Sequence, residues 1–433
     1  MIVICLKKFF NRKKKKEDEE EGEPDIPFGR YSDNNKSTQK VDKLNEADTL
    51  FKEKKYFESI RAFFDYLRDD EMDNVVHEAT EEGGNFHLFQ GSKIIRGSYN
   101  KEKLKAETVL ASMSLASVPV MRRLLERNFT LYYSRYALND DKLTMMMDSD
   151  IETANPSKLY YGLKELATKA DKQDDLLVND FKSLIALDTD HIQPVPEAEK
   201  EIKLKYFKQW IQEALDLIGG VDADKYSGGI AYVLLALAYQ IDFLIVPEGR
   251  LLQEVEKVVE IYFRKDDRPV EFTKLKEKTK GDFFPFLYHS KHTFSIVTPQ
   301  SHKTISDAIY NAAQNINWYK DNKQPRIAEL ISEYGIAFCQ YSYSLPRPIT
   351  ELFLLFMMVN YPNYFEELGF KNDYINKENK SLNREAIIAK IESIEAKWQD
   401  KYPNLKMKTD KVKFEDLVSF NQSFTTEIEL LEL

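Results

Sequence analysis

The sequence has little cysteine: among its 433 residues only Cys5 and Cys339 occur, far apart in the chain. Two cysteines so placed exclude a disulfide framework of the kind that holds small secreted domains together. A reducing compartment is the simplest setting for this content. We therefore predict a cytoplasmic protein.

The sequence also lacks the short motifs that carry catalytic chemistry. It contains no Gly-x-Gly-x-x-Gly pattern, no Walker sequence and no nucleophile motif, and its many carboxylates form no diagnostic pair. We therefore predict a protein without enzymatic activity and without a cofactor. An enzyme with an unrecognised site in the C-terminal half stays open as an alternative.

An excess of basic charge is missing as well. The chain has 62 basic and 72 acidic residues, a net charge of −10. Proteins that bind nucleic acids in general neutralise phosphates with Lys and Arg. The balance therefore argues against a nucleic-acid partner.

Residues 1–44 show neither a signal peptide nor a periodic pattern. The apolar run Met1–Leu6 is too short for a signal-peptide core. The basic block Arg12–Lys16 is followed directly by the acidic block Glu17–Glu21, a charge reversal typical of solvated tails. We predict a disordered charged tail and linker, which we favour over a weak contact of this segment with an anionic membrane.

The longest apolar run, GGIAYVLLALAYQIDFLIVPEG, is barely long enough to cross a membrane. It also contains Gln240 and Asp242, and an Asp at the centre of a bilayer helix costs about 2.5–3.5 kcal/mol. A buried helix of a soluble fold is the favoured interpretation.

Residues 45–185 show the pattern of an α+β domain with an antiparallel sheet and flanking helices. An amphipathic helix is predicted first, with one apolar face made of Leu50, Phe57, Ile60, Phe64 and Leu67. A hairpin in NFHLFQGSKIIRGSY and a third strand in LKAETVLASM follow. A short helix carrying Val120, Leu124 and Leu125 then ends near Asn128.

A second hairpin and a long helix complete the predicted domain. Residues 129–138 and 143–147 alternate in hydrophobicity around the polar turn Asn139–Asp141, as a half-buried antiparallel pair requires. Asn155 is the predicted cap and Pro156 the first residue of a helix with Leu159, Leu163, Leu166 and Ala170 on its inner face.

This order of elements resembles the type III secretion chaperone-like superfamily, which includes the YbjN-type bacterial proteins. The resemblance lies in residues 118–177, in a short helix ending in Leu-Leu-x-x-Asn (Leu124, Leu125 and Asn128), then strand, polar turn, strand and long helix. It extends over residues 45–180, about a third of the chain. It implies a small α+β sandwich without catalytic machinery, which forms a homodimer and holds a client protein on its sheet. The YbjN-like branch implies regulation instead of secretion.

The rest of the chain departs from that family. We predict a linker over residues 186–200 around Pro194 and Pro196, a mainly helical domain over 201–400, and a C-terminal extension over 401–433. Helices are expected around 230–245, 249–264, 302–319, 324–342, 349–360 and 383–399, with HTFSIVTP as the one plausible strand. A regulatory or scaffold protein that binds through this helical half is the first alternative to a chaperone-like module.

Candidate site residues are few. Tyr132, Tyr136 and Met146 lie on the predicted second hairpin, where aromatic and methionine side chains suit adaptable protein contacts; we predict that they bind a client or partner protein. The weak candidates for a metal are His289, His292 and His302, whose spacing matches no standard zinc site, so we predict no metal. Surface or structural roles are expected for these histidines, a solvated loop for His77 and His87, and a buried, inert position for Cys339.

Overall fold

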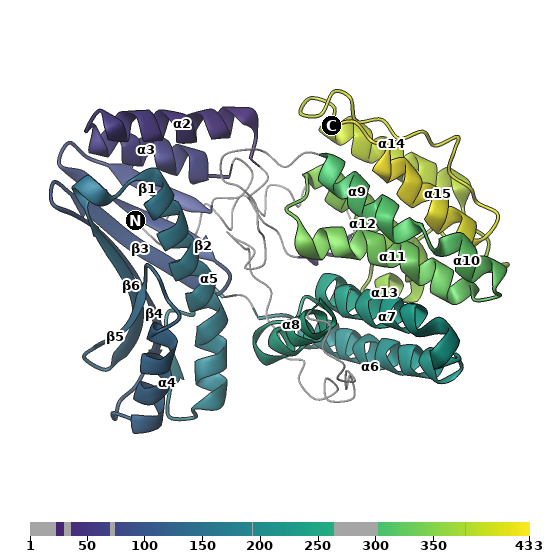
Figure 1. The fold of residues 1–433 in the computed structure, drawn as a ribbon, viewed down its shortest axis with the longest axis horizontal. Helices are drawn as coiled ribbons and strands as arrows, with labels where there is room; N and C mark the ends of the chain where they lie inside the picture. Colours follow the sequence, from purple (N-terminus) through teal and green to yellow (C-terminus); the bar gives the residue numbers. More distant parts are fainter. Residues whose placement is uncertain (1–22, 30–35, 70–73, 193, 264–301, 377) are drawn as a thin grey trace. The chain divides into compact units, whose positions relative to one another are not determined.

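The computed structural model describes residues 23–29, 36–69, 74–192, 194–263, 302–376 and 378–433 (Figure 1). They divide into two compact units. Residues 36–192 belong to the first, which we call the α+β unit; residues 195–263 and 302–433, together with 23–29, belong to the second, the helical unit. Each unit has its own hydrophobic core. The predicted fold class, an antiparallel sheet with flanking helices followed by a mainly helical remainder, is confirmed.

The sheet of the α+β unit is antiparallel throughout, with the strand order β1-β2-β3-β4-β6-β5. Its strands are β1 (Val75–Ala79), β2 (Gly83–Gln90), β3 (Lys93–Asn100), β4 (Lys103–Ser112), β5 (Arg135–Asn139) and β6 (Lys142–Asp150), with the short β7 (Ile185–Ala186) beside β4. The predicted first hairpin is β2–β3 and the predicted third strand is β4. Strand β1 was not predicted, and it contains His77, which we expected in a loop.

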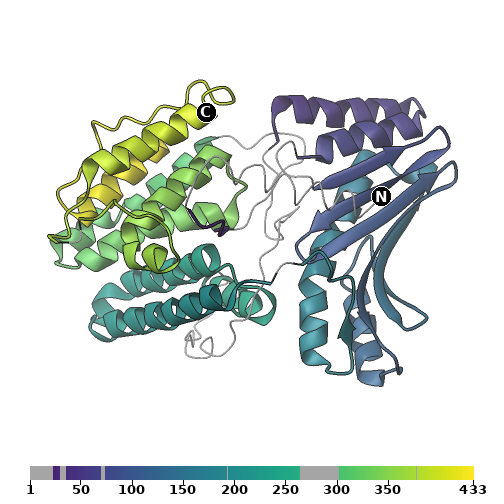
Figure 2. The ribbon, with the colours of Figure 1, turned by 180° about the vertical axis from the view of Figure 1, so that it is seen from behind.

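One face of this sheet is covered and the other is open to solvent (Figure 2). Along β4, Leu104, Ala106 and Leu110 are buried, whereas Lys103, Lys105 and Glu107 are exposed. Helix α5 (Pro156–Asp180) packs across β2, β3, β4 and β6, and α3 (Tyr56–Leu67) packs against β1. The apolar residues of these helices form a single core with the covered face.

The predicted N-terminal amphipathic helix is in fact two helices. Helix α2 (Thr38–Lys52) and α3 are separated at Lys54, whose φ is 62°. The N–H of Lys55 then donates to the carbonyl of Leu50. Helix α2 also begins inside the predicted tail, where the Ser37 side chain accepts from the N–H of Lys40.

The short helix and the long helix have the predicted positions, but the strand between them does not. Helix α4 (Val118–Asn128) and α5 are present, and the Asn155 side chain caps α5 by accepting from the N–H of Lys158 at 2.9 Å. The prediction of a strand over 129–138 is wrong for its first half, because β5 begins only at Arg135. Residues 129–134 form a turn instead.

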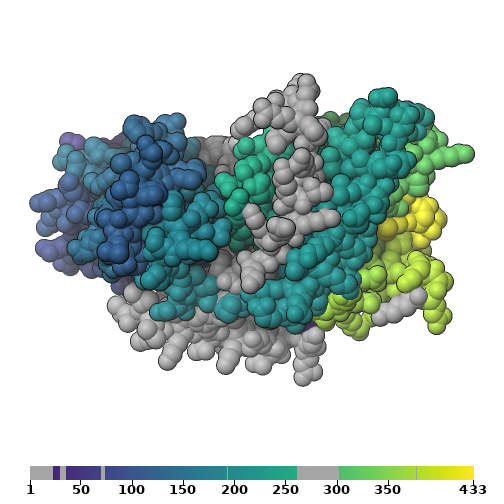
Figure 3. Space-filling model, turned by 90° about the horizontal axis from the view of Figure 1, so that it is seen from below, coloured from purple at the N-terminus to yellow at the C-terminus, as the bar shows by residue number. Residues whose placement is uncertain are grey.

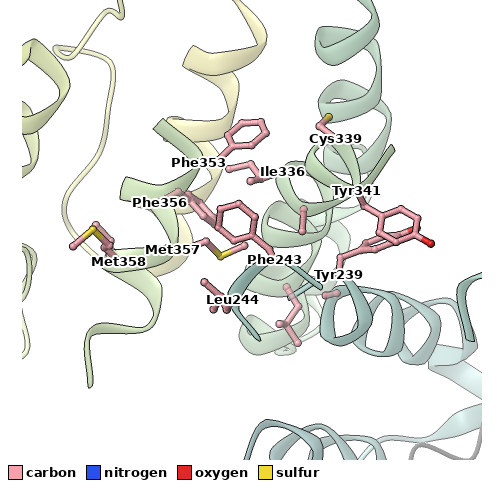
Figure 4. Packing of buried hydrophobic residues seen from close by; sticks show 14 of the residues in the cluster. Tyr239, Phe243, Leu244, Ile336, Cys339, Tyr341, Phe353, Phe356, Met357 and Met358 are labelled. Atoms are coloured by element: carbon pink, nitrogen blue, oxygen red, sulfur yellow. The ribbon is translucent and has the colours of Figure 1, made fainter. Parts of the chain in front are cut away.

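The helical unit is built from α6 to α15. Their bounds are α6 (Glu197–Gly219), α7 (Ala223–Gln240), α8 (Gly249–Phe263), α9 (His302–Ala313), α10 (Ile316–Asp321), α11 (Pro325–Ser342), α12 (Arg347–Asn360), α13 (Pro362–Glu367), α14 (Arg384–Trp398) and α15 (Leu417–Glu429). Figure 4 shows Phe353, Phe356 and Met357 of α12 packed in its core, and Cys339 of α11 is buried as expected. The predicted C-terminal extension is part of this core, because Phe420 and Phe424 of α15 are fully buried.

The longest apolar run forms α7 and a following π-helical turn, Ile241–Ile245. In the described part of the chain, Ala223–Ile245 is the one stretch long and apolar enough to cross a membrane, and 72% of its most apolar window is buried inside the fold. Gln240 and Asp242 are buried with it. A core helix of a water-soluble fold has these properties, in agreement with the favoured interpretation.

Candidate functional site

Helix α4 carries apolar side chains on two opposite faces. At about 100° per residue, Val118, Leu125 and Phe129 fall within about 40° of each other, with Val120 and Leu124 on the other side. Val120 and Leu124 are buried in the core of the α+β unit. Val118, Leu125 and Phe129 are 79%, 60% and 92% exposed. Folding of this unit therefore uses only one of the two faces, and of the two leucines in the Leu-Leu-x-x-Asn pattern Leu124 is buried and Leu125 is exposed.

Exposed apolar side chains also flank both ends of the helix. Leu115, just before α4, is 83% exposed, and Tyr132, in the turn after it, is 91% exposed. Phe129 itself keeps helical dihedral angles (φ −67°, ψ −15°), so it extends the row. We call Leu115, Val118, Leu125, Phe129 and Tyr132 the α4 surface. Figure 3, seen from below, shows this blue part of the chain at the surface of the α+β unit.

A carboxylate from α5 fixes the turn that displays Tyr132. Glu165 accepts hydrogen bonds from the backbone N–H groups of Tyr132, Tyr133 and Ser134 at 2.8–2.9 Å, and from the Ser134 hydroxyl at 2.7 Å. Partial burial raises the pKa of Glu165, but these hydrogen bonds outweigh it and the net pKa is lowered. The turn is thus held by its backbone, and the Tyr132 side chain is left in solvent.

Asn128 fixes the other end of this turn. Its side-chain oxygen accepts from the N–H of Tyr136 at 2.8 Å, and its amide nitrogen donates to the carbonyl of Tyr136 at 3.5 Å. The side chain thereby pairs with β5 as a neighbouring strand would. This gives the Asn of the Leu-Leu-x-x-Asn pattern a structural role, because it joins the end of α4 to the edge strand.

The predicted client-binding residues do not form one surface. Tyr136 is only 7% exposed and belongs to the core, where burial raises its pKa to about 12. Tyr132 lies in the turn and not on a strand. Met146 lies on the open face of the sheet, between Arg135 of β5 and Glu107 of β4. The interpretation of Tyr132 and Tyr136 as one sheet face is therefore wrong, and the open sheet face around Met146 is polar.

The histidines lie in separate places. His302 begins α9, is half-buried, and contacts the carbonyl of Ile428 at 2.8 Å; His289, His292 and the predicted strand 292–299 lie outside the described residues. His77 stacks on Phe64 and bonds the Tyr99 hydroxyl at 3.0 Å, and burial lowers its pKa to about 4. It is a packed strand residue, which corrects the solvated-loop expectation. Over the residues that the structure describes, no group of three or more potential metal ligands is found.

A buried polar cluster joins the β2–β3 turn to α5. Lys93 forms an ion pair with Asp174 at 2.8 Å, and the Ser92 hydroxyl donates to the same carboxylate at 2.8 Å. Asp171 accepts from the N–H of Ser92 and the amide of Gln90. Burial and the nearby Asp174 raise the pKa of Asp171 to about 6. Serine, lysine and aspartate could supply acid–base chemistry. Ser92 and Lys93, however, are only 3% and 1% exposed, and their polar groups contact the carboxylates of Asp171 and Asp174.

The helical unit holds a second buried pair that could move a proton. The Tyr361 hydroxyl donates to the Glu333 carboxylate, 2.6 Å from each oxygen. Burial raises the pKa of Glu333 to about 7, against the lowering effect of Arg326. Glu333 is only 1% exposed, so this pair is closed to a substrate in this structure.

Comparison with known proteins adds no relative: no protein-family model matches this chain, and no curated protein matches it either.

Proposed function

We propose that this protein is a non-enzymatic, cytoplasmic protein-binding module that binds a protein partner through the α4 surface. One observation carries the proposal. Of the 12 large hydrophobic side chains found exposed in the described residues, nine lie between Leu115 and Ile185, and five of those make up the α4 surface. Exposed apolar side chains that gather on one element mark interaction sites, whereas single ones are ordinary.

Hydrogen bonds behind the α4 surface hold its backbone in a fixed conformation before a partner binds. The Glu165 and Asn128 contacts fix the backbone on both sides of the turn, so little conformational entropy is lost when Tyr132 and Phe129 become ordered against a partner. Arg122 is exposed about 40° from Val118 around the helix, at one edge of the apolar row, and Glu126 is exposed beyond it. Aromatic and arginine side chains are typical of the residues that dominate protein interfaces.

A chaperone-like or regulatory role follows from the family resemblance and is part of this proposal, with the contact moved from the sheet to α4. The partner is a client protein or, in a homodimer, a second copy of the chain. The net charge of −10 supports a protein partner over a nucleic acid. Binding through the helical unit is the alternative, supported by the exposed side chains of Tyr310 and Trp318.

The test compares the full chain with three single variants. Phe129→Asp changes the α4 surface, Met146→Asp changes the open sheet face, and Tyr310→Asp changes the helical unit. Sedimentation velocity reports a second copy, and quantitative co-purification from native lysate reports a client. We expect binding to fall about tenfold or more only with Phe129→Asp. Loss with Met146→Asp or Tyr310→Asp alone, in a folded protein, would refute the assignment to α4.

A further inference from the structure

Residues 23–29, from the predicted tail, lie on the helical unit without regular secondary structure, and the N–H of Ile26 donates to the carbonyl of Pro24 at 3.0 Å, as in a γ-turn. The side chains of Pro24, Ile26 and Phe28 are half-buried, and those of Glu23, Asp25 and Pro27 between them are exposed. This alternation shows that one side of the segment lies against the helical unit and the other faces solvent. Ile26 and Phe28 pack against the core of the helical unit.

Phe28 is the aromatic anchor of this segment. Its ring centroid lies 5.1 Å from that of Phe365, 5.6 Å from Phe370 and 6.4 Å from Tyr364. The Lys203 ammonium lies 5.9 Å from the same ring on the α6 side. Aromatic pairs in this range attract each other beyond the area that they bury.

Gly29 ends the segment at a position that admits no side chain. Its φ is 68°, and a Cβ there would lie 2.7 Å from Nε2 of Gln340 and 2.9 Å from the Phe243 ring. Its N–H donates to the carbonyl of Phe243 at 2.7 Å. Phe243 lies in the π-helical turn that ends α7, where carbonyls lack helical partners, so Gly29 satisfies a group that the helix leaves open.

We propose that Lys203, Phe243, Gln340, Phe365 and Phe370 form a peptide-binding site, and that residues 24–29 are its built-in, separable ligand. The contacts that hold the segment are three alternate apolar side chains and a terminal Phe-Gly, which is the recognition pattern of a short linear peptide. The partner that fits is thus a short linear peptide of the form Pro-x-Ile-x-Phe-Gly, supplied by a second polypeptide when the chain's own segment leaves. This inference is independent of the α4 surface.

The experiment releases the segment from the intact, folded protein. A specific protease site is inserted between residues 31 and 35 of the full chain, and a fluorophore is attached to Cys5, since Cys339 is buried. After cleavage, fluorescence anisotropy follows the labelled N-terminal fragment while a synthetic peptide of residues 23–29 is added. Circular dichroism of cleaved and uncleaved protein reports whether the helical unit stays folded.

We expect the peptide to displace the fragment in a saturable way while the helical content is unchanged. A Phe28→Ala peptide should compete at least about tenfold more weakly, as for an interface anchor, whereas a Glu23→Ala peptide, altered at an exposed side chain, should match the original within about twofold. A fragment that stays bound under a large peptide excess would overturn the proposal, because the segment would then be an integral part of the fold. Unfolding upon release, or displacement equally strong with the Phe28→Ala peptide, would overturn it too.

Discussion

At the scale of single residues, the half-buried Glu165 carboxylate takes the place of a neighbouring strand as hydrogen-bond acceptor. The backbone N–H groups of residues 132–134 would pair with a neighbouring strand if the predicted strand continued through them. They donate to the Glu165 carboxylate instead, from a residue more than 30 positions away. The local alternation of Tyr and polar residues carries no information about that partner, so the sequence could not reveal the turn.

We predict that Glu165→Gln destabilises the α+β unit by about 1–3 kcal/mol, because one of two acceptor oxygens becomes a donor facing N–H groups. The folded-state pKa of Glu165 is lowered. Its stabilisation is therefore complete above its ordinary pKa and is lost as the pH falls through the lowered value. Urea unfolding at pH 7 and pH 3 should show the variant's deficit at pH 7 and a smaller one at pH 3. An equal deficit at both pH values would contradict this account.

The contribution of Asp171 to stability should depend on pH in the direction opposite to that of Glu165. Its folded-state pKa of about 6 lies above the ordinary value of 3.8, so the folded state binds more protons between these values and stability falls as the pH rises through them. Over about two pH units this amounts to about 3 kcal/mol at most. The Asp171→Asn variant cannot ionise, and its urea-unfolding free energy should vary less from pH 4 to pH 6.5. Parallel curves for variant and original would show that Asp171 does not titrate in this range.

Tyr132 and Tyr136, which the sequence placed on one face, should behave differently when truncated. Tyr136→Ala leaves a cavity in the core and should cost about 3–5 kcal/mol. Tyr132→Ala should change stability by no more than about 0.5 kcal/mol, because the side chain is 91% exposed. Thermal unfolding of the two variants measures both effects. A similar loss for the two would mean that Tyr132 packs on the fold.

At the scale of elements, regular periodicity predicted most helices and strands, and the failures have non-local causes. The β2–β3 hairpin, β4, α4, α5 and the apolar helices α7 and α12 follow from the local pattern. The break between α2 and α3 has no glycine or proline to mark it; it depends on Lys54 adopting a positive φ. Strand β1 was missed because its residues Val75–Ala79 are short and polar at one end, and only pairing with β2 makes them a strand.

The sequence of helix α4 contains a second apolar face that the prediction did not use. Two apolar faces can be read from the positions of Val118, Leu125 and Phe129 against Val120 and Leu124. A helix packed on one side of a domain needs one such face. The second face was therefore a detectable signal of an exposed apolar surface, whereas the supporting roles of Asn128 and Glu165 needed the structure.

At the scale of the whole molecule, the division into an α+β unit and a helical unit was predictable, but its boundaries were not. Residues 24–29 pack on residues more than 170 positions later, and α15 completes a core begun by α6. Both segments are flanked by polar residues, so composition alone marked them as a tail and an extension. The linker, predicted over 186–200, is shorter, because α6 begins at Glu197.

These boundaries predict which fragment is stable. Residues 36–192 should unfold in one cooperative transition, whereas 45–185 should be markedly less stable. The shorter fragment removes the buried Val41 and Leu44, and at its other end the Arg96–Asp188 ion pair and the His191 contact with Ser92. Urea unfolding followed by circular dichroism makes the comparison. Equal midpoints would mean that these segments add nothing to the fold.

The most direct test of the central claim is photo-crosslinking in cells that express the full chain. A photoreactive amino acid replaces Phe129 on the α4 surface, Glu107 on the open sheet face or Tyr310 on the helical unit, one position at a time. All three side chains are exposed, so each is equally able to report a neighbour. We predict one discrete crosslinked product, to a client or a second copy, from position 129 and none from the other two. A product from position 107 or 310 with none from 129 would contradict binding through α4.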